Sequence, residues 1–323
     1  MAEFKNEFSW SFSKAKDFSA CPRRYYWERY GSWGGWENMA PQKVKDAYRL
    51  KHMKNRYALV GIAVDLAVKE AVAKIQAGEE VTFEEAYKTA RDYLVKVWYE
   101  HQKKDYEKNP KRSTCIRDLY FSEFLIGDDE SRQAWGDFIK ERLTVCLENF
   151  FGMILPKLRP YLANGEIIPI GGEGIQSESF TIGGVKIYAA PDSVIKTEDK
   201  ILIVDWKTGK QQQYHEYQVR VYGIWAQKKH GIPAHMIELA LVYLPDGTWK
   251  NVPYDEERDS ETFKYISESV ECMRDKLKGR DIELNEPLNM EEFEQTGCLE
   301  ECARCNFVEL CQRTFTLALK DES

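Results

Sequence analysis

The chain has 323 residues, 43% of them hydrophobic and 31% charged, with a formal net charge of −7. This length can bury a core as one large domain or two smaller ones. No apolar run is as long as a membrane span, and the N-terminus lacks the apolar stretch of a secretory signal, so we expect a cytoplasmic protein. The acidic balance argues against a general nucleic-acid binder but allows an enzyme with a local basic path. A candidate path is the stripe Lys43, Lys45, Arg49, Lys51, Lys54 and Arg56.

Residues 1–160 predict a mainly helical lobe. Apolar residues recur at helical spacing over 60–77 and stop before Gly78, and further helices are expected over 83–99 and 131–151. The Lys-, Asn- and Pro-containing stretch 103–112 predicts an exposed loop.

From about residue 166 the sequence changes to short apolar or alternating runs. They cover 167–170, 175–182, 185–195 and 201–204, and Gly183-Gly184 and 198–200 separate the later ones, which predicts a β-meander. A helix over 213–230, a strand over 237–244 and an amphipathic helix over 256–277 should follow. We therefore divide the chain into a helical lobe (1–160), an α/β core (161–250) and a C-terminal helix with a cysteine-rich segment (251–323).

The sharpest motif is Asp192 followed by Asp205-Trp206-Lys207. Alternate side chains of a strand share a face, so Asp205 and Lys207 should project together with Trp206 turned away. Two carboxylates and an ammonium gathered in a sheet are costly unless something binds there, and Mg²⁺ suits such a site. The alternative is that Asp192 caps a turn while Asp205 and Lys207 lie on a solvated face. The apolar run directly before Asp205 favours the functional interpretation.

The segment Asp205-Trp-Lys-Thr-Gly209 resembles the core strand of the RecB-type branch of the PD-(D/E)XK nucleases. Three further motifs in the same order strengthen the resemblance, which extends from residue 11 to residue 311. They are Ser11-Phe-Ser13 with Cys21-Pro-Arg-Arg-Tyr25, then Gly61 to Asp65, then Gln218 with Tyr222.

The resemblance implies an α/β fold with a restriction-endonuclease-like mixed sheet flanked by helices. It implies a metal-dependent DNA nuclease, in which an exonuclease on ends or single strands is expected, acting in DNA repair, CRISPR adaptation, phage replication or defence. No helicase P-loop is present, so a helicase, recombination or CRISPR motor would be a partner protein. The implied catalytic residues are Asp192, Asp205, Lys207 and Gln218. The implied ligands of Mg²⁺ or Mn²⁺ are Asp65, Asp192, Asp205 and Trp206. The expected DNA contacts are Tyr222, Arg23 and Arg24.

Asp65 departs from the family, which usually has a histidine at this position. A carboxylate is a harder ligand than imidazole and still suits Mg²⁺ or Mn²⁺. The alternative is an ordinary exposed Asp with that ligand lost, and with it a non-catalytic DNA-binding or scaffold protein that keeps the nuclease fold.

Four of the eight cysteines lie close together near the C-terminus: Cys298, Cys302, Cys305 and Cys311. In a reducing compartment such clustering indicates metal binding, and four thiolates suit either zinc or a [4Fe–4S] cluster. Either Cys298 or the distant Cys21 can supply the fourth ligand. Nucleases of the AddB and CRISPR-adaptation type use an N-terminal cysteine with this spacing, so the resemblance implies an iron–sulfur cluster at Cys21, Cys302, Cys305 and Cys311, with the C-terminal segment packed back on the N-terminus.

Overall fold

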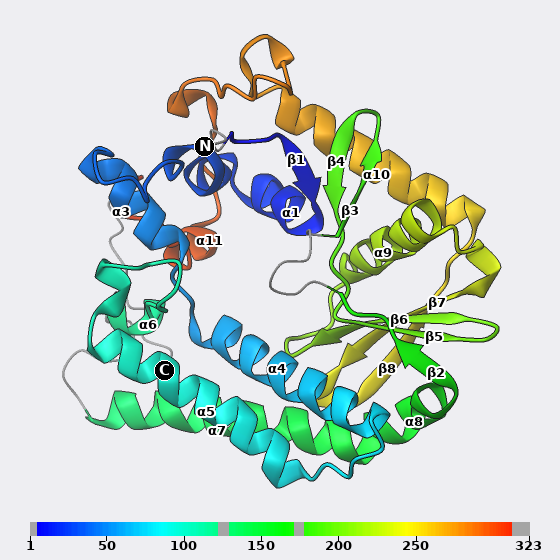
Figure 1. The fold of residues 1–323 in the computed structure, drawn as a ribbon. Coiled ribbons are helices and arrows are strands. Elements are labelled where there is room, and N and C mark those ends of the chain that lie inside the picture. Colours follow the sequence, from blue (N-terminus) through cyan, green and yellow to red (C-terminus); the bar gives the residue numbers. More distant parts are fainter. Residues whose placement is uncertain (1–4, 122–128, 171–177, 312–323) are drawn as a thin grey trace, which may run out of the picture.

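The computed structural model describes residues 5–121, 129–170 and 178–311, in which two sheets are surrounded by helices (Figure 1). The strands are β1 (Ser9–Ser11), β2 (Gly165–Ile167), β3 (Ser179–Ile182), β4 (Val185–Tyr188), β5 (Ser193–Thr197), β6 (Ile201–Lys207), β7 (Ile237–Tyr243) and β8 (Thr248–Val252). The α-helices are α1 (Phe12–Ala20), α2 (Pro22–Tyr26), α3 (Gln42–Lys51), α4 (Arg56–Gln76), α5 (Phe83–Gln102), α6 (Arg117–Tyr120), α7 (Asp129–Asn149), α8 (Leu155–Asn164), α9 (His215–His230), α10 (Glu256–Arg274) and α11 (Leu299–Ala303). Short π and 3₁₀ turns are η1 (Trp27–Gly31), η2 (Asp105–Glu107), η3 (Phe150–Ile154), η4 (Ala234–Met236), η5 (Leu244–Asp246), η6 (Lys278–Arg280) and η7 (Met290–Glu292).

The larger sheet is mixed and has the strand order β2-β5-β6-β7-β8 within the described residues. β6 pairs antiparallel with β5 and parallel with β7, and α9 forms the crossover between the two parallel strands. The run Ile-Leu-Ile-Val that begins β6 is buried along its whole length. A continuous apolar run of this kind is typical of a central strand covered on both faces.

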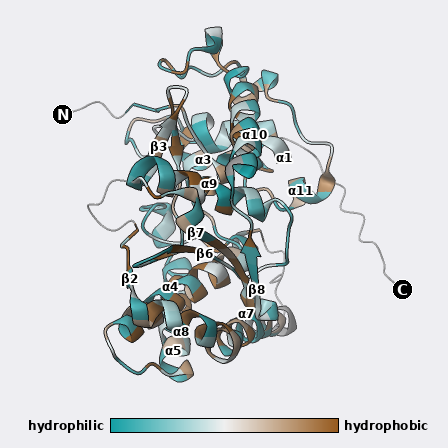
Figure 2. Cartoon of the chain, turned by 90° about the vertical axis from the view of Figure 1, so that its right-hand side faces the viewer, coloured by the Kyte–Doolittle hydropathy of each residue, from teal (hydrophilic) through white to brown (hydrophobic). Residues whose placement is uncertain are grey.

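The two faces of this sheet contribute to two separate cores. Ile201 and Ile203 face the core that contains α9 and the small sheet, whereas Leu202 and Val204 face the core built from α4, α5, α7 and α8. In Figure 2 the apolar strands β6 and β7 accordingly lie between layers of helices. Because side chains alternate along a strand, Asp205 and Lys207 belong to the face that α9 covers.

The smaller sheet has the order β1-β4-β3, with β1 parallel to β4. The expectation of a single meander over 166–204 is therefore wrong. The run 185–195 divides into β4 and β5, which belong to different sheets, at the segment that contains Pro191. A proline cannot donate to a strand ladder, and it ends the pairing here. The part of the predicted strand 175–182 that precedes Glu178 lies outside the described residues.

The expected helices over 60–77, 83–99, 213–230 and 256–277 correspond to α4, α5, α9 and α10 with small shifts of their ends. Asn55 caps α4, accepting a hydrogen bond from the backbone N–H of Ala58 at 2.9 Å, and Thr82 and Glu85 form a capping box on α5. No helix of the described residues is both long enough and apolar enough to cross a membrane.

Candidate active site and cysteine cluster

The end of β6 carries the central carboxylate of the site. Asp205 is 1% exposed, and Lys207 Nζ lies 2.5 Å from its Oδ2 atom. This ion pair neutralises Asp205 Oδ2 from one side, and no other donor reaches that oxygen among the described residues. Lys207 thus offsets part of the cost of burying this carboxylate.

Asp192 lies in the short segment immediately before β5, opposite the end of β6. Its Oδ2 accepts a hydrogen bond from the backbone N–H of Trp206 at 2.8 Å, one step beyond the Ser193–Val204 pair of the ladder. The sequence predicts Asp192 on the preceding strand, and the structure places it just before the first residue of β5. The Trp206 indole points to the other face and donates to Ser193 Oγ at 3.2 Å, so only the backbone carbonyl of Trp206 is available as a metal ligand.

A chain of hydrogen bonds links β6 to α9. Lys207 Nζ donates to Gln218 Oε1 at 2.8 Å, and Gln218 Nε2 donates to the Tyr222 hydroxyl at 2.8 Å. That hydroxyl in turn donates a long hydrogen bond of 3.5 Å to Asp205 Oδ1. Because Gln218 and Tyr222 are four residues apart, they share one face of α9. Together they fix the position of the Lys207 ammonium.

Asp65 approaches the same point from α4. A Cβ added at Gly61, one turn earlier, would lie 3.4 Å from Thr208 Oγ1, so α4 passes close to the end of β6. Asp65 Oδ2 pairs with Lys69 at 2.9 Å, while its Oδ1 is buried with no hydrogen-bond partner among the described residues. Asp65 thus lies near enough to Asp192 and Asp205 for its charge to act on both.

Burial and neighbouring negative charge raise the pKa of two carboxylates of the site, Asp192 and Asp205. Burial is the main cause for Asp192, and Asp205 and then Asp65 add to it, so that its pKa rises to about 7. Burial also raises the pKa of Asp205, against the opposing effect of Lys207. Such mutual repulsion is relieved by a divalent cation, and carboxylate oxygens are the ligands that Mg²⁺ prefers. The donor set therefore fits Mg²⁺ or Mn²⁺, although no group of three His, Cys, Asp or Glu side chains among the described residues already has the arrangement of a metal site.

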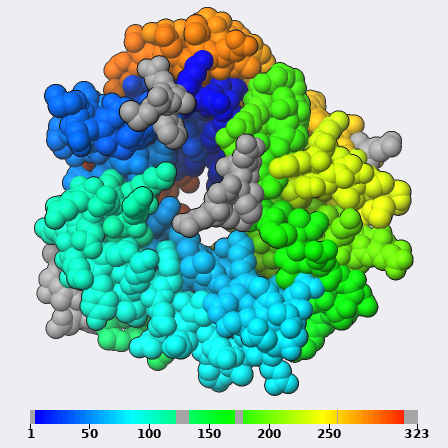
Figure 3. Space-filling model, viewed as in Figure 1, coloured from blue at the N-terminus to red at the C-terminus, as the bar shows by residue number. Residues whose placement is uncertain are grey.

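A cleft of about 680 Å³ opens beside Lys207, between the start of α4 and the loop after β6. The space-filling view shows the molecule hollowed at its centre, with the light blue α4 along one border (Figure 3). Sequence reasoning missed most of the residues that line this cleft, because they come from separate segments and form no motif. Its basic residues are Arg56, Arg117, Lys207, Lys210 and Arg304, and its one acidic residue is Asp118.

His215, at the start of α9, also lines this cleft. Its Nδ1 lies 3.1 Å from the Tyr243 hydroxyl, and burial, followed by the nearby Lys207 and Lys16, lowers its pKa to about 4. The imidazole is therefore neutral at physiological pH, and it places a polar group beside Lys207 without adding charge.

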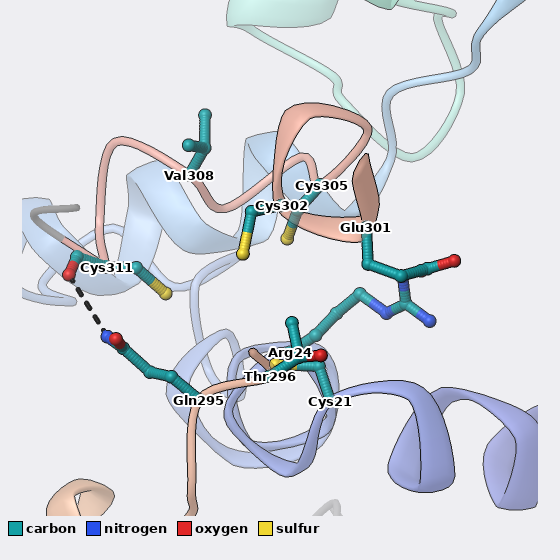
Figure 4. Close-up of a pocket in the computed structure, with 9 residues that line it drawn as sticks. All are labelled: Cys21, Arg24, Gln295, Thr296, Glu301, Cys302, Cys305, Val308 and Cys311. Carbon is teal, nitrogen blue, oxygen red and sulfur yellow. Dashed lines mark hydrogen bonds and ion pairs between the residues drawn. The ribbon is translucent and has the colours of Figure 1, made fainter. Parts of the chain in front are cut away.

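Four cysteines line one cavity between α2 and the C-terminal segment (Figure 4): Cys21, Cys302, Cys305 and Cys311. Cys298 does not line this cavity; it is exposed, and its Sγ donates to Glu300 Oε2 at 3.1 Å. Burial raises the pKa of the Cys305 thiol to about 12 and also raises that of Cys311. Soft sulfur donors from the two ends of the chain thus meet at one place, separate from the carboxylates.

Arg23 and Arg24 lie beside this cavity and are engaged by protein groups. Arg23 Nε donates to the Phe293 carbonyl at 2.8 Å, and Arg24 forms ion pairs with Asp17 at 3.2 Å and Glu301 at 3.0 Å. Both arginines therefore connect the N-terminal helices to the C-terminal segment. We predict that both arginines contact DNA. They could do so only through N–H groups that do not already bond to the protein.

The comparisons with known proteins define the class of this protein. A family model described as the PD-(D/E)XK nuclease superfamily matches residues 9–312, and the chain belongs to that superfamily. Its fold is the mixed α/β arrangement that the sequence predicts, and the superfamily implies a nuclease acting on nucleic acid.

The other comparisons add little. The search of curated proteins finds no match. Six solved chains match significantly. One of them, from a structure titled "Crystal structure of SSO0001", is 18% identical and covers 57% of this chain and 82% of that chain, with a TM-score of 0.25.

Proposed function

We propose that this protein is a Mg²⁺- or Mn²⁺-dependent deoxyribonuclease of the RecB-type branch, with Asp192, Asp205 and Lys207 at its catalytic centre. The observation that carries the proposal is the gathering of Asp192 and Asp205 at the end of β6 beside Lys207, with Asp65 close by and its Oδ1 buried without a hydrogen-bond partner among the described residues. The remaining site residues, Gln218 and Tyr222, hold this lysine and this carboxylate in place.

The roles of the residues follow from their chemistry. A bound Mg²⁺ or Mn²⁺ would supply a Lewis acid for the phosphoryl oxygen and lower the pKa of a bound water. Asp65, Asp192, Asp205 and the Trp206 carbonyl would hold the ion. Lys207 carries the positive charge that orients the attacking water and offsets the negative charge that develops on the phosphoryl oxygens. Gln218 accepts a hydrogen bond from Lys207 and so holds the ammonium at the end of β6 independently of its ion pair with Asp205.

The basic cleft beside Lys207 supports nucleic acid as the substrate, because its arginines and lysines outnumber Asp118 in a protein of net charge −7. We propose exonuclease action on ends or single strands. DNA repair, CRISPR adaptation, phage replication and defence are the settings in which such an enzyme would work, with a helicase or a recombination or CRISPR protein as its partner.

The cysteine cavity is proposed as a second metal centre, with a [4Fe–4S] cluster in preference to zinc. Cys21, Cys302, Cys305 and Cys311 would be its ligands, and Cys298 would not take part. The thiolate set suits soft metals and excludes Mg²⁺. This centre would be structural, because it joins the two ends of the chain at a distance from the carboxylates.

The direct test of the nuclease assignment compares cleavage of labelled linear and circular DNA with and without Mg²⁺ and Mn²⁺. Asp205→Ala and Lys207→Ala should each lower the cleavage rate at least about a thousandfold, because each removes charge from the transition state. Asp199→Ala, in the exposed turn before β6, is the matched control and should cleave at the wild-type rate. Wild-type activity of either site variant in Mn²⁺ would refute the assignment, and linear DNA cut in preference to circular DNA would support the exonuclease.

A further inference from the structure

A second basic cavity, of about 750 Å³, lies between β1, the start of α1, η1 and the end of β4. Its lining includes Ser11 and Ser13 of the Ser11-Phe-Ser13 motif, to which the carboxylate site assigns no role. β1 and α1, dark blue in Figures 1 and 3, border the central hollow of the molecule. The polar groups that matter here are Ser9, Ser11, Ser13, Lys14, Arg29 and Lys51.

The charge of this cavity is opposite to that of the whole protein. Its basic residues are Lys5, Lys14, Arg29 and Lys51, whereas Glu7 is its one acidic residue, in a chain of net charge −7. Glu7 is exposed and also pairs with Lys186, outside the lining, at 3.5 Å. The residues that line the cavity therefore carry a net positive charge.

Within the described part of the chain, the cations of this cavity have no close anionic partner, although Glu28 attracts Arg29 and Lys51, and Asp17 attracts Arg29, from a longer distance. Among the residues that the structure describes, neither Arg29 nor Lys51 forms an ion pair within 4 Å, and Arg29 Nε is buried without a hydrogen-bond partner. Lys14 Nζ donates only to neutral acceptors, the carbonyl and the hydroxyl of Ser9. Burial and then the repulsion of Arg29, Lys51 and Lys186 lower the pKa of Lys14 to about 7. A bound anion would relieve this repulsion.

Two aromatic rings complete the cavity. Trp33 is 36% exposed, and the ammonium groups of Lys14 and Lys186 lie 5.6 and 5.2 Å from the centroid of the Tyr188 ring. Basic groups that neutralise phosphate, beside rings on which bases stack, are the combination by which proteins hold single-stranded nucleic acid.

The cavity is close to the catalytic centre along the chain. Tyr188 ends β4 and precedes Asp192 by four residues, so their Cα atoms are at most about 14 Å apart. We propose that Lys14, Arg29 and Lys51, with the serine hydroxyls, bind a phosphate group of the nucleic acid strand a few nucleotides from the bond at Asp192 and Asp205. This inference rests on the proposed nuclease function and adds to it a subsite that binds the strand away from the cleaved bond.

The test measures binding of a fluorescent single-stranded oligonucleotide to the full chain carrying Asp205→Asn, over a range of salt concentrations. Lys14→Gln and, separately, Lys51→Gln should each weaken binding by roughly tenfold at low salt. Each should also reduce the slope of log affinity against log salt by about 0.7, the value for one lost phosphate contact on a single strand. Lys264→Gln, an exposed lysine on α10, is the matched control and should change neither quantity.

Oligonucleotides with a 5′-phosphate, a 3′-phosphate or neither distinguish a terminal from an internal phosphate. A terminal phosphate predicts a preference for one phosphorylated end that Lys14→Gln abolishes, whereas an internal phosphate predicts equal binding of all three and an equal loss in the variant. Binding by both cavity variants that equals that of the Lys264→Gln control would overturn the proposal.

Cleavage by the same substitutions in the otherwise wild-type chain separates this proposal from the nuclease assignment. The subsite predicts a higher KM with kcat nearly unchanged. If the wild type cuts DNA and both variants keep its KM, the subsite is refuted while the nuclease stands. If the wild type never cuts DNA but binds it in a Lys14-dependent way, the nuclease is refuted and the phosphate site stands.

Discussion

Asp192 and Asp205 are held close together by the β5–β6 ladder, and no choice of rotamer can separate them widely. The backbone N–H of Trp206 fixes Asp192, and Lys207 and Tyr222 contact Asp205. At the scale of single residues, the ionised carboxylates of Asp192 and Asp205 therefore repel each other, and a bound cation would reduce this repulsion. The two carboxylates are close together and buried only in the folded state, so their repulsion must appear as a dependence of stability on pH.

The sign of this dependence is set by the raised pKa of Asp192. The folded protein retains a proton up to about pH 7 that the unfolded chain releases near pH 4, so stability falls as the pH rises between these values. Asp192→Asn keeps the acceptor for Trp206 and removes the charge. In divalent-free buffer above pH 7 it should be more stable than wild type by ~1–3 kcal/mol, measured by urea unfolding, with the two proteins equal at pH 4. A wild-type advantage that instead grew with pH would contradict this.

Asp65 gives a second prediction at this scale. Asp65→Ala should weaken Mn²⁺ binding by at least about tenfold, while DNA binding without metal should stay the same, because the residue is expected to touch the cation and not the strand. Titration of Mn²⁺ followed by electron paramagnetic resonance measures the first quantity. Glu70→Ala, an exposed acid on the same helix, should leave Mn²⁺ affinity unchanged. Equal Mn²⁺ affinity of wild type and Asp65→Ala would favour the loss of this ligand and the scaffold alternative.

At the scale of elements, α9 positions the site from one side through a close contact with the segment after β8. The helix carries Gln218 and Tyr222, and Gly223 follows directly. A Cβ at Gly223 would lie 2.5 Å from a ring carbon of Tyr254, whose hydroxyl is a hydrogen-bond partner of Gln227 on the same helix. The glycine is thus required by the packing of α9, although glycine is a poor helix former.

The same substitution should have opposite effects at two helical glycines. Gly223→Ala should destabilise the protein by about 1–3 kcal/mol, because Tyr254 has to move and the helix has to shift. Gly136→Ala, on α7, meets no atom within 4 Å and should stabilise it by about 0.5–1 kcal/mol through helix propensity alone. Chemical denaturation measures both. Stabilisation by Gly223→Ala would show that the contact with Tyr254 is dispensable.

At the scale of the whole molecule, helix α2 near the N-terminus and the segment 294–301 are joined by polar contacts around the cysteine cavity. The backbone N–H of Arg23 donates to the carbonyl of Glu294 at 3.1 Å, and Arg24 pairs with Glu301. A guanidinium nitrogen of Arg117, which lines the cleft beside Lys207, donates to the Ala303 carbonyl at 2.7 Å. The C-terminal segment up to residue 311 is therefore connected to the cleft beside Lys207 as well as to the N-terminal helices.

Loss of Cys21 should accordingly weaken the whole fold. If Cys21 is a cluster ligand, Cys21→Ser should bleach the absorbance of the anaerobically purified protein and lower its stability by more than about 4 kcal/mol, because metal binding at a folded site counts as folding energy. Cys298→Ser, at the exposed cysteine, is the matched control and should change neither. The reverse pattern would place the site wholly in the C-terminal segment. Colourless protein with one zinc per chain would retain the four ligands and refute the iron–sulfur cluster.

The sequence by itself determined the central strand and the polar residues at its end. Ile-Leu-Ile-Val followed by Asp205-Trp206-Lys207 predicts both a buried strand and the face that its last residues share, because a strand alternates with a period of two. The helical periods of α4 and α9 are likewise local properties. Asp65, Gln218 and Tyr222 could be selected from the sequence only through the order of family motifs, since each is unremarkable in its own segment.

Only the tertiary structure decided what depends on contacts between distant segments. The pairing of β1 with β4 and the meeting of Cys21 with Cys302 join the two halves of the chain. The cations around Lys14 and those beside Lys207 come from separate segments and form no motif. The spacing of apolar residues along the chain determines the local secondary structure. A cavity is instead formed where several elements pack together, so it depends on the whole tertiary structure.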